Sequence, residues 1–139
     1  MAKKILIVFY SRTGTTKKVA EELANQLNAD IEEIIDLKNR NGIKGFLYGG
    51  IDAFLKKHTK IVEIKGNLSK YNLIVVGTPI WAGHITPAVR TYMHCNKNKF
   101  GNVACFCTMG GNNPRKTFEE IQEVIGKEPV AKFSIQNRE

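Results

Sequence analysis

The chain has 139 residues, which is enough for one compact domain and too few for two. Hydrophobic residues make up 42% of it and charged residues 24%, which excludes a disordered or a fibrous protein. The longest apolar stretch, residues 5–10, is shorter than a membrane span of about 20 residues or a secretory apolar region of about 7–15 residues. We therefore predict one domain over residues 1–139 that is cytoplasmic and not associated with a membrane.

Basic residues are in excess and unevenly placed. Lys and Arg number 21 against 13 Asp and Glu, and residues 64–118 hold seven Lys and Arg but no Asp or Glu. Such a surface predicts an anionic ligand or a partner with an acidic surface. Aromatic residues do not alternate with the basic ones, so we expect no nucleic acid partner. Three cysteines exclude a disulfide scaffold.

The first half of the chain alternates strand and helix patterns. An apolar run over residues 4–10 predicts a buried strand. Helical spacing predicts a helix over residues 15–28, and a strand follows over residues 30–35. After a loop over residues 37–45 we expect a second helix, weakened by two adjacent glycines. Its apolar positions are Leu47, Ile51, Phe54 and Leu55.

The second half continues this alternation. A third strand over residues 72–76 is predicted to run into a turn-rich loop over residues 77–83. Thr86 followed by Pro87 predicts a helix N-cap and the first helical position. The remaining predicted elements are a strand over residues 103–109, a helix starting at Pro114 and a strand over residues 130–135.

Strands that alternate with helices form a parallel sheet with right-handed crossovers, so we predict a doubly wound α/β fold. Ligands of such sheets bind beyond the carboxyl ends of the strands. Three loops leave those ends, at residues 11–16, 77–84 and 110–113. We expect the functional site there.

The first of these loops has the chemistry of an anion site. Its hydroxyl groups and free backbone N–H groups lie at a helix N-terminus, where the helix dipole favours a phosphate. It lacks the Lys-Ser/Thr pair of a Walker A loop and the G-x-G-x-x-G pattern, which favours a terminal phosphate over a pyrophosphate. The alternative is that these residues only cap the helix.

The other two loops suit a flat, polar-edged ligand. Trp81, the only tryptophan, is predicted to stack on such a ligand. The alternative is that it closes over the following helix as a hydrophobic plug. The third loop supplies backbone donors and amide side chains.

The order of these motifs resembles one known family. The segment Ser11-Arg12-Thr13-Gly14-Thr15-Thr16 after an apolar strand resembles the phosphate-binding loop of the flavodoxin family, and residues 77–81 resemble its ring-binding loop. The resemblance covers essentially the whole chain by the order and spacing of elements. It implies a flavodoxin-like, five-stranded parallel sheet in the order 2-1-3-4-5, with FMN as the cofactor.

The resemblance also implies which residues hold FMN. The phosphate would lie on Ser11, Arg12, Thr13, Gly14, Thr15 and Thr16. One side of the ring would lie on Thr78, Pro79, Ile80 and Trp81, and its pyrimidine edge on Gly110, Gly111, Asn112 and Asn113. The peptide between Ala82 and Gly83 would turn to meet the flavin N5. No catalytic acid or base and no metal ligand is expected.

The chain departs from that family in two ways near the flavin. Its third loop holds no aromatic residue, so the second flavin face is either open or covered by Phe46 or Tyr48. Basic residues also replace the usual carboxylates, which predicts a less negative flavin potential than in an acidic relative. These residues are Lys65, Lys70, Arg90, Arg115 and Lys116.

A third departure lies at the carboxyl end. The resembling fold normally ends with a helix after its last strand, whereas four residues follow Ile135 here. We expect this helix to be lacking and one sheet face to carry uncovered apolar side chains. Such a patch usually marks an interface, which predicts a homodimer through that face.

Cysteine and histidine residues allow other chemistry. Cys105 and Cys107 are predicted to share one strand face, and Cys95 follows His94. Metal-ligand spacing is absent, so buried, unreactive thiols are favoured over a metal site. For His84, either a proton-donating role or plain solvent exposure fits the sequence.

The predicted function is that of an FMN-binding flavodoxin-like protein that transfers electrons through the exposed flavin edge. Its partner would be a redox protein with an acidic surface or a small anionic acceptor. The alternative is an FMN-dependent oxidoreductase, quinone-reductase-like or protoporphyrinogen-oxidase-like, working by hydride transfer at N5. A phosphoacceptor domain is excluded, because the strand ends at Tyr10-Ser11 and Gly77-Thr78 carry no carboxylate.

Overall fold

The computed structural model describes residues 4–64, 66–110 and 113–136. Its centre is a sheet whose parallel strands are β1 (Ile5–Phe9), β2 (Asp30–Glu33), β3 (Leu73–Trp81), β5 (Asn102–Met109) and β6 (Ala131–Gln136). They lie in the order β2-β1-β3-β5-β6, and a two-residue strand, β4 (His84–Ile85), pairs only with β3. The predicted doubly wound order of five parallel strands is therefore confirmed, with β4 as an addition.

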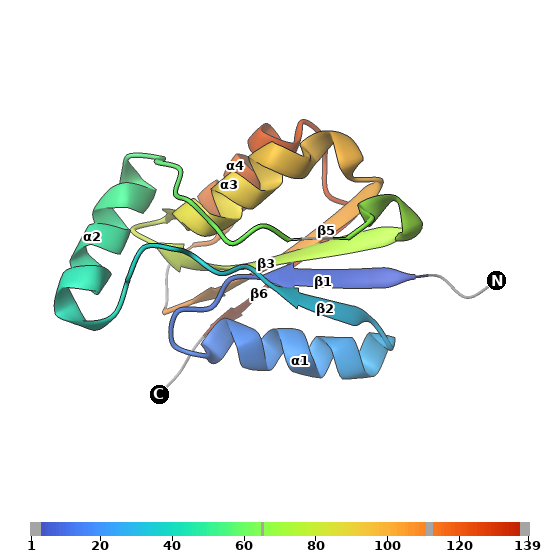
Figure 1. Ribbon diagram of the computed structural model, residues 1–139, viewed down its shortest axis with the longest axis horizontal. Helices are drawn as coiled ribbons and strands as arrows, with labels where there is room; N and C mark the ends of the chain where they lie inside the picture. Colours follow the sequence, from blue (N-terminus) through green and yellow to red (C-terminus); the bar gives the residue numbers. More distant parts are fainter. Residues whose placement is uncertain (1–3, 65, 111–112, 137–139) are drawn as a thin grey trace.

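Helices cover both faces of the sheet. Helix α1 (Thr15–Leu27) lies on one face, and α3 (Pro87–Asn96) and α4 (Arg115–Ile125) lie on the other (Figure 1). Successive β1 residues divide between two cores: Ile7 packs toward α1 and Val8 toward the opposite face. This alternation follows from the two-residue period of a strand buried on both sides. No helix in the described part of the chain is long and apolar enough to cross a membrane.

Strand β3 is longer than predicted. It continues through Trp81 and turns back into β4, with Trp81 paired to His84. The two residues between them, Ala82 and Gly83, have φ angles of 51° and 82°. Two positive φ angles give a turn whose twist matches a hairpin. The predicted loop over residues 77–83 is therefore wrong, and the chain reverses only at Ala82-Gly83.

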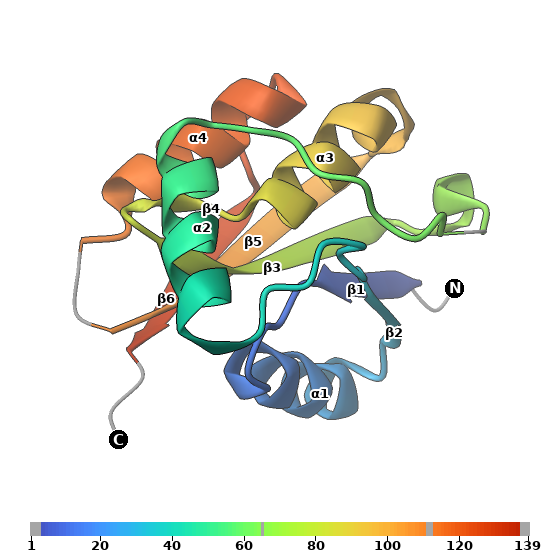
Figure 2. The same ribbon diagram turned by 60° about the vertical axis from the view of Figure 1, so that its left-hand side comes forward.

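Helix α2 (Gly42–Phe54) begins inside the segment predicted as a loop. It lies beyond the carboxyl ends of the strands and contacts α3 (Figures 1 and 2). A Cβ at Gly45 would lie 2.1 Å from the carbonyl carbon of Arg40, and one at Gly49 would lie 2.9 Å from the Trp81 ring. Gly45 and Gly49, which lower the helix propensity of this segment, are therefore close packing contacts.

The face of α2 that the sequence predicted to be buried is exposed instead. Its large apolar side chains lie 50–64% exposed at Leu47, Ile51, Phe54 and Leu55. Burial falls on Gly45, Gly49, Asp52 and Ala53. The helix thus packs on the sheet through its small residues and turns its large ones outward.

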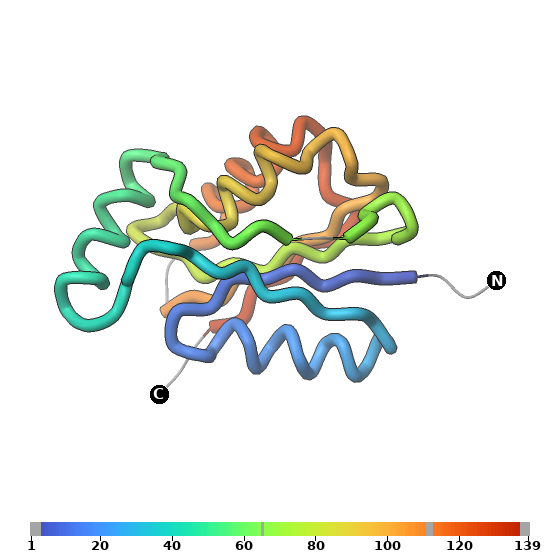
Figure 3. The backbone as a smooth tube through the Cα atoms, viewed as in Figure 1, coloured from blue at the N-terminus to red at the C-terminus, as the bar shows by residue number. Residues whose placement is uncertain are grey.

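Strand β6 forms one edge of the sheet (the red end of the tube in Figure 3). All six of its residues are exposed. Phe133 stacks on Phe106 with ring centroids 5.4 Å apart, and Phe133 and Ile135 remain partly open to solvent. Apolar side chains on this edge strand are therefore uncovered, as the sequence predicted.

Candidate functional site

The three predicted loops meet at one cavity of about 150 Å³ at the carboxyl edge of the sheet. The first loop contributes Ser11, Arg12, Thr13, Thr15 and Thr16, and the end of β3 contributes Pro79, Ile80 and Trp81. The remaining lining residues are Phe46, Thr108, Met109 and Gly110. Nine of the residues predicted to bind the cofactor are thus brought together.

The first loop presents hydrogen-bond donors to this cavity. Gly14 caps α1 in the left-handed conformation, with φ 101°, and its N–H donates to Ser11 Oγ over 3.0 Å. That bond uses an acceptor pair of Ser11 and leaves the hydroxyl proton of Ser11 available. The first N–H groups of α1 have no carbonyl partner within the helix, and its first turn holds no acidic residue. This geometry favours an anion.

A buried hydroxyl pair joins the loop to the sheet. Thr16 Oγ1 and Thr108 Oγ1 share a hydrogen bond of 2.8 Å, and both side chains are buried. The pair fixes the start of α1 against the end of β5. Sequence reasoning did not assign Thr108 or Met109 to the site, although their place immediately before Gly110, at the end of a strand, is a signal that could have found them.

The lining chemistry fits a phosphate. Among the described residues around this cavity there is no carboxylate, and the polar groups are hydroxyls, backbone N–H groups and one guanidinium. A dianion there meets donors without like-charge repulsion. The residues present therefore fit the phosphate end of FMN.

Arg12 connects the loop to α2. Its Nε donates to the Arg40 carbonyl over 2.8 Å, and Nη2 donates to the Gly42 carbonyl over 3.1 Å. The guanidinium also lies 5.7 Å from the Phe46 ring. The side chain of Arg12 thus points toward α2, and Phe46 of that helix lies beside it and also lines the cavity.

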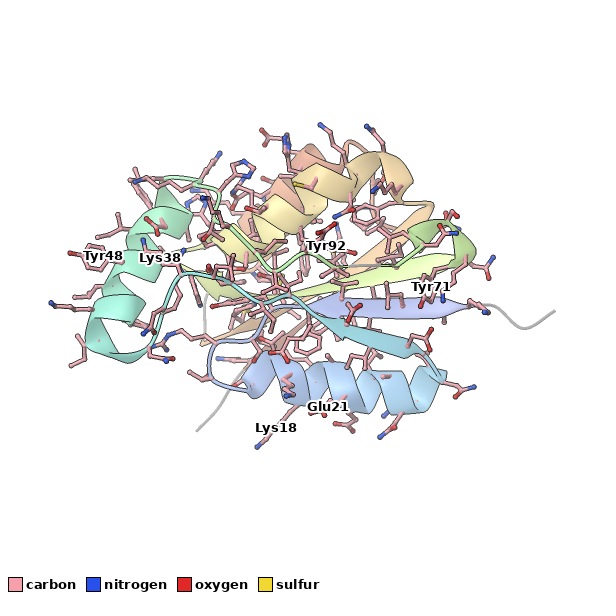
Figure 4. The ribbon with its side chains drawn as sticks, viewed as in Figure 1. Lys18, Glu21, Lys38, Tyr48, Tyr71 and Tyr92 are labelled. Carbon is pink, nitrogen blue, oxygen red and sulfur yellow. The ribbon has the colours of Figure 1, made fainter. Side chains whose placement is uncertain are left out.

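Phe46 and Tyr48 have different surroundings, although the sequence offered both as a cover for the flavin. Phe46 lines the cavity. Tyr48 lies on the outer side of α2, where Lys38 Nζ is 5.8 Å from its ring (Figure 4). Of the two, only Phe46 is placed to cover a ligand in the cavity.

Trp81 is fixed by contacts on several sides. Its ring meets Tyr10 edge-on at 5.6 Å, and the Arg40 guanidinium lies 5.9 Å from it. Gly49 packs against the ring, so α2, rather than the following helix α3, covers Trp81. Burial, followed by the charge of Asp36, raises the pKa of Tyr10 to about 12, so this phenol stays protonated. One part of the Trp81 ring still lines the cavity.

An ionic network behind Trp81 holds α2 in place. Buried Arg40 donates from Nε to Asp36 over 3.0 Å and from Nη1 to Asp52 over 2.7 Å. Lys38 Nζ donates to the same Asp52 oxygen over 3.1 Å. Burial alone would raise the pKa of Asp52, but the hydrogen bonds from Arg40 and Lys38 hold it below its usual value.

The other predicted site residues lie outside this cavity. Thr78 is fully buried, and its hydroxyl donates to the Pro79 carbonyl over 2.8 Å. Ala82 and Gly83 form the β3–β4 turn, where the Gly83 carbonyl accepts from Thr117 Oγ1 over 3.2 Å. Gly14 does not line the cavity, and Asn113 lies just before α4, where its Oδ1 accepts from the Arg115 N–H over 3.0 Å. Gly111 and Asn112 lie outside the described residues.

His84 is part of a largely buried polar cluster. Its Nδ1 lies 2.8 Å from Glu120 Oε1, and the other oxygen of Glu120 pairs with Arg90. The expectation of a solvent-exposed His84 is therefore wrong. Arg90 is likewise buried and paired, so it adds no positive charge to the open surface, and Lys65 lies outside the described residues. Sequence reasoning missed this cluster because Glu120 is 36 residues from His84.

The cysteines divide into buried and exposed. Burial raises the pKa of Cys105 to about 11 and that of Cys107 further, so both are unreactive thiols at neutral pH. Cys95 is exposed. Within the described ranges, no three His, Cys, Asp or Glu residues gather in a geometry that would hold a metal ion.

Known proteins resemble this chain in structure. No protein-family model and no curated protein sequence matches the chain. Among solved structures, it is similar to a Lactobacillus acidophilus flavoprotein in complex with FMN, with 26% identity and a TM-score of 0.84 over 96% of this chain and 93% of that one. A Bacteroides eggerthii flavoprotein gives 23% and 0.78, over 96% and 87%. A WrbA-like flavodoxin from Agrobacterium tumefaciens gives 16% and 0.60, over 91% and 75%, and these last two bear on the fold alone.

The parallel sheet of this chain, with helices on both faces, agrees with these likenesses. By its sheet order and by its likeness to these solved structures, the chain has the flavodoxin-like fold.

Proposed function

We propose that the protein binds FMN with its phosphate in the cavity where the three loops meet and its ring beside Trp81, and that it transfers electrons through the flavin edge. The observation that carries the proposal is the cavity lining: a helix N-terminus, several hydroxyls and Trp81 converge without a carboxylate among the described residues. The likeness to a flavoprotein in complex with FMN supports the same cofactor.

Different residues of the chain would hold the phosphate and the ring of FMN. The loop at Ser11 to Thr16 would hold the phosphate, and the Thr16–Thr108 hydrogen bond keeps that loop fixed before FMN arrives. Trp81 and Met109, at the ends of the neighbouring strands β3 and β5, would contact the ring. When bound, FMN supplies one- and two-electron redox chemistry, which needs no protein acid or base. The positive surface of the chain would favour an acidic partner or a small anion.

A second candidate, an FMN-dependent oxidoreductase, is favoured by one observation. A larger cavity of about 490 Å³ adjoins the first and shares Arg12, Phe46, Ile80 and Trp81 with it. Its volume lies in the range of about 300–1,000 Å³ that holds small molecules. An enzyme needs room for a second substrate beside the cofactor, and this cavity would provide it.

Titration of the purified chain with FMN tests the cofactor. Quenching of the single tryptophan and a shifted visible spectrum are expected at micromolar FMN, and riboflavin should bind at least about tenfold more weakly because it lacks the phosphate. Equal affinity for FMN and riboflavin would contradict the phosphate site. Absence of any spectral change would contradict FMN binding altogether.

Turnover separates the two functions once FMN is bound. Oxidation of NADH or NADPH that depends on an added quinone supports the oxidoreductase. Electron exchange with a reduced acidic redox protein, without such turnover, supports the carrier.

A further inference from the structure

The larger cavity has helix α2 on one side and the end of the sheet on the other. It lies between α2 and the β3–β4 hairpin, two elements that are neighbours in the fold (Figure 2). The helix contributes Phe46, Leu47, Gly50, Ile51, Phe54 and Leu55. The opposite side contributes Arg12, Ile80, Trp81 and Ala82.

The apolar side chains of this wall are exposed without an evident structural reason. Phe46, Leu47 and Phe54 are 65%, 57% and 64% exposed on one helix. Leaving such side chains in water forgoes the stabilisation that burial provides, and contiguous apolar patches of this kind mark binding sites. A ligand in the cavity would remove these surfaces from water.

The cavity keeps its shape because α2 cannot collapse into it. Buried Arg40 and Asp52 anchor one side of the helix. Gly49 rests against the Trp81 ring, so the helix is already at its closest approach to the hairpin. Gly50, the next residue, faces open space, since a Cβ there would have no atom within 4 Å.

Arg12 determines the charge that the cavity accepts. Among its described lining residues, Arg12 is the sole charged one, and no described carboxylate pairs with its guanidinium. Two of its five N–H donors are used by the carbonyls of Arg40 and Gly42. The remaining donors and the positive charge favour an anion. Aromatic rings at Phe46, Phe54 and Trp81 favour a flat hydrocarbon beside it.

We propose that this cavity binds a flat aromatic anion, an aromatic carboxylate or sulfonate, with its acidic group on Arg12 and its rings against α2. The occupant would be the second substrate of the flavoprotein. That role rests on the proposed function, whereas the binding itself does not, because every wall of the cavity is made by the chain.

The test uses the FMN-free chain and three naphthalene probes. Isothermal calorimetry measures the binding of 2-naphthoate, of its neutral counterpart 2-naphthamide and of the cation 2-naphthylmethylammonium. The expected order is naphthoate first, with naphthamide about tenfold weaker and the cation weaker still. Arg12→Gln should remove the preference for naphthoate over naphthamide. Equal affinities for the three probes in the unmodified chain would overturn the proposal.

A filled cavity provides the second arm. Gly50→Leu places a side chain in the open space and should abolish naphthoate binding. Gly101→Leu is its matched control, because a Cβ at Gly101 also meets no atom within 4 Å and Gly101 does not line the cavity. Circular dichroism verifies that both variants fold. If Gly50→Leu does not fold, the probe series on the unmodified chain decides whether the cavity binds the anion. Unchanged naphthoate binding by folded Gly50→Leu would overturn the proposal.

Competition with FMN separates this proposal from the preceding one. Saturating FMN should weaken naphthoate binding by less than about tenfold, because Arg12 and Trp81 line both cavities whereas most of the α2 wall belongs to the larger cavity alone. Displacement of naphthoate by FMN would assign the cavity to the flavin itself and overturn the second-ligand site. If FMN does not bind, the probe series and the Gly50→Leu arm still decide whether the anion site exists.

Discussion

Replacing Asp52 by Asn should loosen the anchor of α2. The substitution removes the carboxylate that accepts from Arg40 over 2.7 Å and from Lys38 over 3.1 Å. Removing one partner of a buried ion pair costs about 3–5 kcal/mol when the other charge is left alone. Here Arg40 keeps Asp36 at 3.0 Å, so one charge-assisted hydrogen bond, about 2 kcal/mol, is the expected loss in the free energy of unfolding.

The contribution of Lys38 is small by comparison. Its side chain is 50% exposed, and a pair of that kind contributes about 0.5 kcal/mol or less. Urea unfolding followed by tryptophan fluorescence measures the loss, because Trp81 lies 5.9 Å from Arg40. The matched control is Glu119→Gln, whose pair with Arg115 is 80% and 63% exposed. It should change the free energy of unfolding by less than about 0.5 kcal/mol.

The pH dependence has a definite sign. The pKa of Asp52 is lower in the folded chain than its ordinary 3.8, so its stabilisation is fully present above pH 3.8. It is lost as the pH falls through the lower, folded pKa. The stability gap between the unmodified chain and Asp52→Asn should therefore be constant near neutrality and close below pH 3.8. An unchanged free energy of unfolding at neutral pH, or a gap that widens in acid, would refute the anchoring role.

Two further results are expected. Gly50→Ala should raise the free energy of unfolding by about 0.5–1 kcal/mol through helix propensity. Gly49→Ala should lower it by about 1–3 kcal/mol, because the added methyl group overpacks against the tryptophan ring. Paired urea titrations measure both, and equal effects would contradict the packing of α2. A thiol reagent at neutral pH should modify Cys95 rapidly and reach Cys105 and Cys107 only after unfolding, as a time course with and without denaturant would show; fast modification of all three thiols would contradict the buried core.

Local patterns were enough to predict the sheet and the place of the hydroxyl-rich loop at its carboxyl edge. The apolar run of β1 and the hydroxyl-rich segment after it lie next to each other in the sequence, so their chemistry is visible without tertiary contacts. The same holds for the start of α3, where the Thr86 hydroxyl accepts from the Val89 N–H, as its N-cap pattern predicts. These features are decided within a few residues.

The errors concern residues whose partners are distant in sequence. From the sequence, Gly49 is expected only to weaken the helix. In the structure, a Cβ at this position would clash with the Trp81 ring. His84 reads as a solvent-exposed loop residue until Glu120 is seen beside it. The apolar spacing on the outward face of α2 predicts a core face, because a buried and an exposed apolar face have the same spacing. In the structure the ion pair between Asp52 and Arg40 holds the opposite side of the helix against the sheet. Such pairings depend on tertiary structure, which periodicity does not encode.

The most direct test of the flavin site is a two-dimensional ¹H–¹⁵N NMR titration of the chain with FMN. We predict that the largest shifts fall on the amides of Gly14, Thr15 and Thr16, on the end of β5 at Thr108 to Gly110, and on the indole N–H of Trp81. Shifts confined to other parts of the chain, or none at saturating FMN, would contradict the assignment of the cavity.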